Sequence, residues 1–471
     1  MKLKRVALSI LTALTFSLPL QAASTNSGAK VDYDAAGKEA TKILCDYLKV
    51  DTTNPPGNEK LGADFLADII RKEGLEATVV DLGKNRSLVC SRLKGTGKKK
   101  GIILMNHIDV VPAVAADWKH APFGGEIHDG EIWGRGAIDM KGMGVIELEA
   151  FLMLKRSGVK LDRDVVFLAT PDEEAGGECG AGEIKEKCPE LVKDCEFVLN
   201  EGFSIEADDK GNAKYWGVDF AEKNICWFEL TTKGDAGHAS MPMINSSTNR
   251  MARALNRIVN AGPNFRLLPE VEEYFTKISV SENGELKKAY EDIKNAVNDK
   301  QKEPLLLSDL LKSSMLRNTI SLTRMEAGYK TNVIPAKAMA QLDCRLLPDV
   351  KKDEFVAFIT KLVDDPEVEV KVIDWQSNEP SKLQTELYEA IKTVAKEENP
   401  NIPVVPVIVP WFTDSHWMRE LGMTAYGFQP IEVDKLHLAT MHGKDERLPI
   451  KSLENGVRRM HKILVEFCAA K

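Results

Sequence analysis

Histidine and acidic side chains follow apolar segments in this sequence, at positions where they could take part in metal chemistry. His107 and Asp109 come at the end of the apolar segment 100–105. Residues two apart on an extended chain share a face. The carboxylate of Asp109 could therefore hold one imidazole nitrogen of His107 and leave the other for a metal ion. Alone, the pair also fits a histidine with purely structural hydrogen bonds.

Carboxylates recur further along the chain in similar positions. Asp139 follows a glycine-rich segment, 133–138, and directly precedes a segment with helical periodicity, so on its own it fits an N-cap as well as a ligand. The acidic run 172–174 follows the buried strand expected at 165–169. Three adjacent acids would repel one another unless a cation compensates them.

Two further candidates complete the set. Glu201 follows the strand expected at 197–200, which we expect to end there, and His442 lies in a polar loop near the C-terminus. In open α/β sheets, ligands bind beyond the carboxyl ends of strands. Histidine and carboxylate are ligand types that zinc accepts. Together these places predict a metal centre, although each alone has a structural explanation.

The elements that would position these residues alternate between strand and helix patterns. Helices are expected at 33–50, 59–73 and 143–155, and strands at 77–81, 88–93, 100–105, 165–169 and 197–200. This alternation predicts a mixed-sheet α/β catalytic domain with helices on both faces. Its expected ranges are 24–222 and 377–471.

The middle of the chain, 223–376, has a different pattern. Strands at 225–232, 319–324, 333–345 and 368–373 and helices at 246–259 and 352–362 give the order βαββαβ, with a charged helical insertion at 263–312. We therefore expect an inserted, smaller α+β domain.

The first 23 residues are expected to be a cleaved signal peptide. A positive start is followed by an apolar run too short for a permanent membrane anchor, and then by small residues. An uncleaved anchoring helix is the alternative. The signal predicts an exported, periplasmic protein. Its formal net charge of −8 becomes more negative on cleavage, which argues against nucleic acid and anionic membranes as partners.

Eight cysteines are present and none forms a Cys-x-x-Cys pair, so a structural zinc ribbon is not expected. Cys179, Cys188 and Cys195 lie close in sequence, and an oxidising compartment could bridge two of them. The other five are expected to be buried free thiols.

Taken together, these motifs resemble the co-catalytic metallopeptidase family that contains aminoacylase, carboxypeptidase G, bacterial dipeptidases and succinyl-diaminopimelate desuccinylase. The likeness runs from about residue 35 to the C-terminus, with all five motifs in the family's order. It includes Lys-Gly-Asp-Ala-Gly-His-Ala-Ser-Met-Pro at 233–242 and Asn-Val-Ile-Pro at 332–335, which leads to Asp-Cys-Arg at 343–345.

The resemblance implies a role for each candidate and two divalent ions, zinc first, with cobalt or manganese as alternatives. His107 and Glu201 would bind one ion, Glu174 and His442 the other, and Asp139 both, with a cis peptide bond after it. Glu173 would be the general base, and Asp109 would orient His107.

In the inserted domain, which the family uses as a lid, His238 would stabilise the oxyanion, in family dimers that of the other subunit. A loop histidine is the alternative. Arg345 would clamp a substrate carboxylate, unless it is an ordinary strand-end ion pair. Arg317 and Asn318 either assist this clamp or are strand residues without such a role.

The expected activity is hydrolysis of an amide bond next to a free carboxylate, in small peptides or N-acyl amino acids, by a carboxypeptidase or dipeptidase. A strict N-acyl amino acid deacylase is the alternative enzyme. A non-catalytic binding protein on the same fold is the alternative from another class. A homodimer through the lid is one arrangement that the resemblance implies, and the oligomeric state, the substrate side chain and the native metal stay open.

Overall fold

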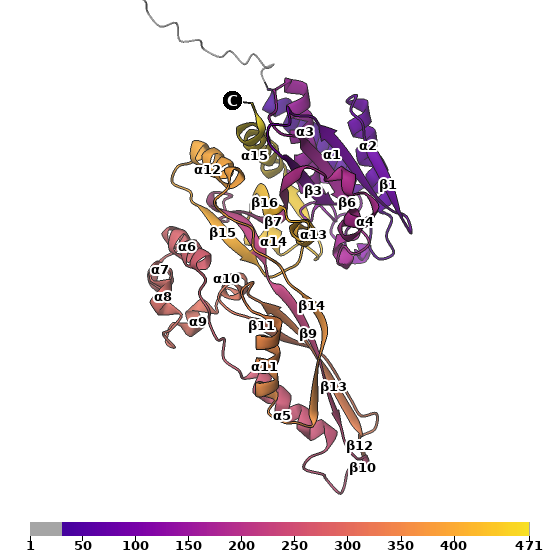
Figure 1. Cartoon of the computed structure of the whole chain (residues 1–471), viewed down its shortest axis with the longest axis vertical. Coiled ribbons are helices and arrows are strands. Elements are labelled where there is room, and N and C mark those ends of the chain that lie inside the picture. The colour runs from indigo at the N-terminus through magenta and orange to yellow at the C-terminus, as the bar shows by residue number, and fades with distance from the viewer. Residues whose placement is uncertain (1–30, 471) are drawn as a thin grey trace, which may run out of the picture.

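The computed structural model describes residues 31–470. The signal peptide expected at residues 1–23 lies outside this range. In the part of the chain that is described, no helix is both long and apolar enough to cross a membrane. Two sheets of different size organise the molecule, and Figure 1 shows them one above the other along its longest axis.

The large sheet has eight strands in the order β1-β2-β6-β3-β7-β16-β8-β15. They are β1 (Thr78–Gly83), β2 (Arg86–Leu93), β6 (Val165–Thr170), β3 (Gly101–His107), β7 (Cys195–Ala207), β16 (Thr424–Val433), β8 (Ala213–Glu222) and β15 (Val404–Val409). The central strands β6, β3, β7 and β16 are parallel neighbours, whereas β1, β2 and β6 pair antiparallel. The sheet is therefore mixed, as expected.

Both faces of this sheet are covered by helices. Ile102 and Leu104 of β3 face the main core, which is closed by the helices on that side, whereas Ile103 and Met105 face a smaller core under α4 and α13. The helices are α1 (Tyr33–Leu48), α2 (Glu59–Lys72), α3 (Lys141–Ser157), α4 (Ile184–Lys187), α12 (Glu386–Glu398), α13 (Ser415–Glu420), α14 (Lys435–Leu438) and α15 (Ile450–Cys468). A three-stranded sheet of β17 (Arg447–Pro449), β5 (Glu131–Trp133) and β4 (Glu126–His128) borders them. Because β3 is buried on both faces, it is apolar from Ile102 to Met105 without alternation.

The smaller sheet, with the two helices on one of its faces, is called the lid below. Its four antiparallel strands have the order β11-β13-β9-β14. The elements are β9 (Asn224–Lys233), α5 (Ser247–Val259), β11 (Thr319–Ala327), β13 (Lys337–Leu346), α11 (Lys352–Val363) and β14 (Val368–Gln376), with the pair β10 (Gly237–His238) and β12 (Val333–Ile334) at its far end. The expected βαββαβ order is confirmed, and the lid has its own apolar core.

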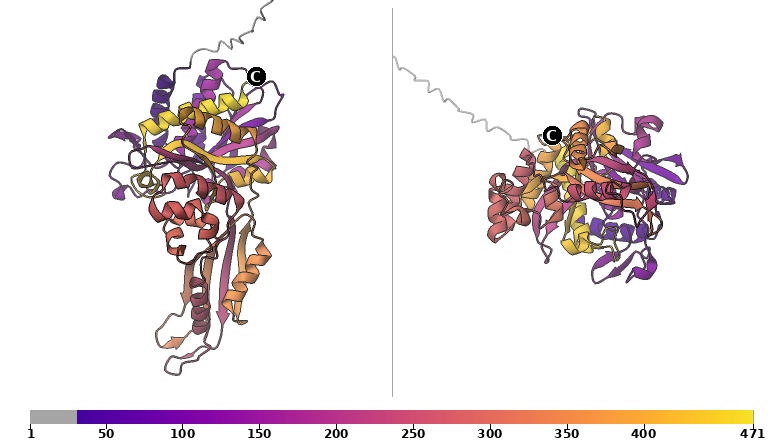
Figure 2. Two further views of the ribbon diagram at one scale, coloured as in Figure 1. Left: turned by 90° about the vertical axis from the view of Figure 1, so that its left-hand side faces the viewer. Right: turned by 90° about the horizontal axis from the view of Figure 1, so that it is seen from below.

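The helical insertion lies within the lid in sequence but packs against the large sheet. Val271, Tyr274 and Phe275 belong to the same apolar core as Trp216 and Val404 of the large sheet. Its helices are α6 (Pro269–Ile278), α7 (Gly284–Glu291), α8 (Ile293–Ala296), α9 (Glu303–Leu306) and α10 (Leu310–Ser314). Figure 2 shows them beside the large sheet, on the side toward the lid.

Two strands differ from the sequence-based expectation. β7 does not end at Asn200 but continues to Ala207, so Glu201 lies inside a strand and not after one. The expectation of a strand end at Glu201 is therefore wrong. Asp219 explains the continuation, because its carboxylate accepts the backbone N–H of Phe203 at 2.8 Å. β8, which carries Asp219, was not expected at all.

The cysteines are free thiols in the part of the chain that the structure describes. The bridge considered among Cys179, Cys188 and Cys195 is therefore not formed. Of the five expected buried thiols, four are buried and Cys45 is only partly so. The apolar cores, and not disulfides, hold these segments together.

Candidate metal and active site

The first group of candidate ligands lies at the carboxyl end of β3. His107 Nε2 is 3.1 Å from Asp139 Oδ1 and 3.6 Å from Glu201 Oε1, and all three residues are buried. On the opposite side of the ring, Nδ1 donates to the backbone carbonyl of Asp109 at 2.9 Å. That bond places a proton on Nδ1, so Nε2 is the ring nitrogen that would bind a cation held by these carboxylates.

A second group shares Asp139 with the first. His442 Nε2 lies 3.0 Å from Asp139 Oδ2 and 3.1 Å from Glu174 Oε2. Asp139 therefore points one oxygen toward each histidine. In each group the ligand atoms lie within 4.8 Å of one another. The structure thus brings together all five residues that the sequence predicted as ligands.

The chemistry of this donor set fits two divalent cations. Each group offers one histidine nitrogen and two carboxylates, a combination that zinc accepts. Glu174 Oε1 is buried and has no hydrogen-bond partner among the described residues, as expected for an oxygen available to a cation. Three carboxylates converge here without a lysine or arginine bound to them, so a cation would relieve their repulsion.

The protonation of the site reflects this crowding. Burial raises the pKa of Glu201 to about 7, against the opposing charge of His107. Hydrogen bonds to Asp139 and Glu174 raise the pKa of His442 to about 10. Cations bound by these groups would compete with the protons, so we expect metal binding to weaken as the pH falls.

Asp109 acts differently from the sequence-based expectation. Its carboxylate is 3.6 Å from His107 Nδ1, and the closer acceptor is its backbone carbonyl. The carboxylate instead accepts the backbone N–H groups of Glu173 and Glu174 at 3.2 and 3.0 Å. Asn54 donates to it as well, at 2.9 Å. Asp109 therefore fixes the loop that carries the expected base and one ligand.

A single carboxylate organises the loop that carries Asp139. Glu446 accepts the backbone N–H groups of Ile138 and Asp139 at 2.8 and 3.0 Å and pairs with Arg135 at 2.6 Å. It is fully buried. The Asp139–Met140 peptide bond is cis, as the resemblance implied. Asp139 makes no N-cap hydrogen bond to α3, whose capping position is Met140.

Glu173 lies at the start of the loop after β6 and lines the cavity next to His442. Burial, followed by the charge of Glu201, raises its pKa well above the usual range. Asp414 contributes to this effect and is itself buried, with one oxygen bound to Thr170 Oγ1 at 2.7 Å. Asp414 was not among the predicted residues.

A cavity of about 820 Å³ lies between the large sheet and the lid. Glu173 and His442 line it from one side and Arg345 from the other. Arg345 pairs with Asp343, Nε to Oδ1 at 2.8 Å and Nη2 to Oδ2 at 3.2 Å. This leaves the other edge of the guanidinium open to the cavity. The aromatic side chains on the wall are Trp227, Trp411 and Phe412.

The structure places His238 away from this site. It is exposed in β10, at the end of the lid farthest from the large sheet (Figure 1). Its Nδ1 accepts from the backbone N–H of Ser240 at 3.2 Å, which leaves Nε2 as the donor. Arg317 and Asn318 do not line this cavity but a different one.

Two supporting residues escaped the sequence-based reading. Asn54 bonds to Asp109, and Arg86 pairs with Asp172 at 2.7 Å, directly before the acidic loop. Asn54 precedes Pro55 and Pro56 in a loop that the sequence does reveal, but its partner is 55 residues away. Only the fold brings such residues together.

Comparison with known proteins gives a consistent result. The profile of peptidase family M20/M25/M40 matches residues 103–466. A protein named "Probable carboxypeptidase S-like 2" from Dictyostelium discoideum is 31% identical, over 78% of this chain and 70% of its own. Human aminoacylase-1 is 27% identical, over 85% of this chain and 88% of its own.

A solved structure shares the fold. The M20 family metallo-carboxypeptidase Sso-CP2 from Sulfolobus solfataricus superposes with a TM-score of 0.69 at 21% identity, over 91% of this chain and 99% of its own. The matched residues 103–466 contain His107, Asp139 and every other candidate ligand described above. The chain therefore belongs to peptidase family M20/M25/M40 and is a hydrolase that acts on amide bonds.

Proposed function

We propose that this hydrolase uses two divalent ions to cleave the amide bond next to a free carboxylate in small peptides or N-acyl amino acids. Zinc is the first candidate for the metal. One observation carries the proposal. A single cavity has the expected ligands Glu174 and His442 with the carboxylate of Glu173 on one side and the guanidinium of Arg345 on the other. That arrangement suits a substrate whose carboxylate lies a short distance from the bond to be cleaved.

In the proposed mechanism, His107 and Glu201 would hold one ion, Glu174 and His442 would hold the other, and Asp139 would be a ligand to each. When bound, the ions supply Lewis-acid chemistry at the scissile carbonyl and the attacking water. Every other step belongs to the chain's own groups.

Glu173 accepts a proton from the attacking water and returns it to the nitrogen of the leaving amine. Its burial beside other carboxylates supports this role, because both raise its proton affinity. Arg345 orients the substrate by its carboxylate. His238 of a second copy donates from Nε2 to the developing oxyanion, because its own lid carries it away from this site.

A strict N-acyl amino acid deacylase is the second candidate. The aromatic wall of Trp227, Trp411 and Phe412 is compatible with it, because such a surface suits an acyl chain as well as an apolar amino-acid side chain. We also infer export to the periplasm from the N-terminal sequence.

Hydrolysis of a panel of dipeptides and N-acyl amino acids tests the proposal. The protein is assayed with zinc, after chelation, and as Glu173→Gln, with Glu186→Gln in the exposed helix α4 as the matched control. We expect activity that needs metal, survives in Glu186→Gln and falls by at least about 100-fold in Glu173→Gln. A protein that binds two metals but cleaves nothing on the panel would be a binding protein instead.

A further inference from the structure

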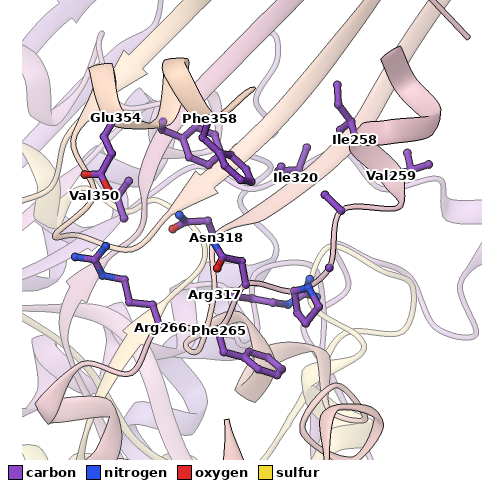
Figure 3. A pocket seen from close by; sticks show the side chains of 15 residues that line it. Ile258, Val259, Phe265, Arg266, Arg317, Asn318, Ile320, Val350, Glu354 and Phe358 are labelled. Atoms are coloured by element: carbon purple, nitrogen blue, oxygen red, sulfur yellow. The ribbon is translucent and has the colours of Figure 1, made fainter. Parts of the chain in front are cut away.

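A second cavity, of about 520 Å³, lies where the lid joins the helical insertion (Figure 3). It shares no lining residue with the active-site cavity. Its walls come from three parts of the chain: the end of α5 with the loop after it, the start of β11, and α11. Its volume falls within the range of small-molecule sites, about 300–1,000 Å³.

One wall of this cavity is apolar. Ile320, Phe355 and Phe358 line it from the lid core, and Ile258 and Val259 from the end of α5. Val259 is 61% exposed, which is unusual for a valine at the end of an amphipathic helix. Figure 3 shows Phe358 and Ile320 above the cavity and Arg317 below it. The wall can accept an alkyl or aryl group.

Arg317 is a cation without an anion. In the described part of the chain, no carboxylate or other acceptor bonds to its guanidinium, and its Nε is buried without a partner. Burial alone lowers its pKa. By contrast, Arg266 on the same cavity pairs with Asp349 at 2.6 Å. A partly buried, unpaired guanidinium is costly, and a bound anion would remove that cost.

Neighbouring groups restrict the charge of that anion. Asn318 uses its side-chain oxygen to accept the N–H of Leu347 at 2.8 Å, so its amide group remains available as a second donor. Glu354 also lines the cavity and would repel a dianion. One unpaired cation, one amide and one carboxylate suit a single negative charge better than a phosphate.

We propose that this cavity binds an amphiphilic monocarboxylate, with its carboxylate on Arg317 and its apolar chain against Phe355 and Phe358. Free fatty acids and N-acyl amino acids share this chemistry. The inference does not depend on the proposed function, since it concerns residues outside the active-site cavity.

Such a ligand would bind at the connection between the two halves of the molecule. The Nζ of Lys223 donates to the backbone carbonyl of Arg317 at 2.7 Å. After burial, the charges of Arg317 and Arg345 lower the pKa of Lys223. An anion on Arg317 would therefore reduce the positive charge that acts on Lys223, where the chain passes from the large sheet to the lid.

Isothermal titration of the whole chain as Glu173→Gln, which prevents turnover, tests the proposal. The probes are octanoate, N-octanoylglycine and the neutral octanamide. Arg317→Gln is compared with Arg324→Gln, an arginine of β11, the strand that follows Arg317, which pairs with Glu326 at the surface. We expect Arg317→Gln to weaken carboxylate binding by about 10-fold or more, to leave octanamide unaffected, and to be partly rescued by Arg317→Lys.

Comparison of octanoate with N-octanoylglycine distinguishes a free fatty acid from an N-acyl amino acid as the ligand. The probe that binds more tightly, and depends on Arg317, identifies the ligand class. Hydrogen exchange that slows at residues 350–358 on addition of octanoate would confirm the place. Equal octanoate affinity in Arg317→Gln and the parent would overturn the proposal. Loss of all binding in Arg345→Gln would also overturn it, because the ligand would then occupy only the active site. A lack of saturable binding of any carboxylate would overturn it as well.

Discussion

At the scale of single residues, the guanidinium of Arg345 has two edges with different partners. Asp343 occupies one edge through two hydrogen bonds, and the other faces the cavity. The pair with Asp343 therefore fixes the direction of the side chain without using all its donors.

The first prediction follows from this geometry. Arg345→Gln should raise the KM for substrates with a free carboxylate by about 10- to 150-fold, the worth of a charge-assisted hydrogen bond. Substrates with a carboxamide in its place should change little. Arg345→Lys should recover only part of the loss, since lysine keeps the charge but not the fork. Steady-state kinetics with matched acid and amide substrates measure this, and an equal loss for both would show that Arg345 is structural.

A second prediction concerns Glu446, which touches no expected ligand side chain. Glu446→Gln replaces one acceptor oxygen by a donor that faces backbone N–H groups, and it removes the buried negative charge with which Arg135 pairs. Breaking a buried pair of this kind costs on the order of 3 kcal/mol. Urea unfolding should show that loss, and titration should show weaker metal affinity. Unchanged metal affinity would mean that the Asp139 loop holds its shape without Glu446.

How much of the site the sequence could predict depends on the kind of residue. The residue types of His107, Asp139, Glu174 and His442, with His107 and Glu174 directly after expected strands, pointed to a metal centre, and the structure brings them together. The partner of His107 Nδ1 could not be predicted correctly, since a backbone carbonyl leaves no mark in the sequence.

At the scale of elements, a buried lysine connects β8 to β9. Lys223 is 1% exposed and donates to Arg317 O and Thr319 Oγ1. Burial, then the charges of Arg317 and Arg345, lower its pKa to about 7. A neutral amine has the two protons that these two bonds need.

The third prediction is the pH dependence that results. In the unfolded chain Lys223 keeps its proton up to about pH 10.4, whereas in the folded chain it loses it near pH 7. The unfolded state therefore binds more protons between these values, and stability should rise with pH by up to about 1.4 kcal/mol per unit. Because the pKa of buried Lys141 is also lowered to about 7, part of the rise should persist without Lys223, and urea unfolding at pH 7 and 9 should show a steeper rise in the parent protein than in Lys223→Met. Parallel pH profiles would contradict a neutral Lys223.

Most elements agree with their sequence patterns within a few residues, and the exceptions share a cause. The strand β8 and the extension of β7 contain Asp219, Glu222 and Glu206, polar residues that interrupt the apolar run. Their partners come from distant positions, as when Arg419 pairs with Glu222 at 2.9 Å. In a sequence, a buried carboxylate cannot be distinguished from a surface carboxylate until its partner is known.

At the scale of the whole molecule, the distance between His238 and the metal ligands requires a second copy if His238 acts in catalysis. The edge strand β11 offers a surface for one, since its residues from Ser321 to Ala327 are exposed. Met325 is 60% exposed and Leu322 37%. An exposed apolar edge of this kind favours pairing with another sheet.

The fourth prediction is complementation between two inactive variants. Glu173→Gln and His238→Ala should each be nearly inactive alone, and mixing them after reversible dissociation should restore activity. Statistical mixing gives half of the dimers as hybrids, and each hybrid has one intact site. The recovered activity should therefore approach a quarter of the parent value. No recovery, with hybrid dimers demonstrated by mass spectrometry, would place both residues in the same subunit's site.

The insertion of α6 to α10 into the core of the large sheet means that the chain crosses between the two halves four times. The crossings are at Lys223, at residues 260–266, at residues 317–319 and at residues 377–378. With two crossings the lid could rotate about several axes relative to the large sheet, whereas four crossings restrict that rotation. A change in the angle between the lid and the large sheet would therefore bend the chain at all four crossings together. The residues at these crossings set the energy of that bending.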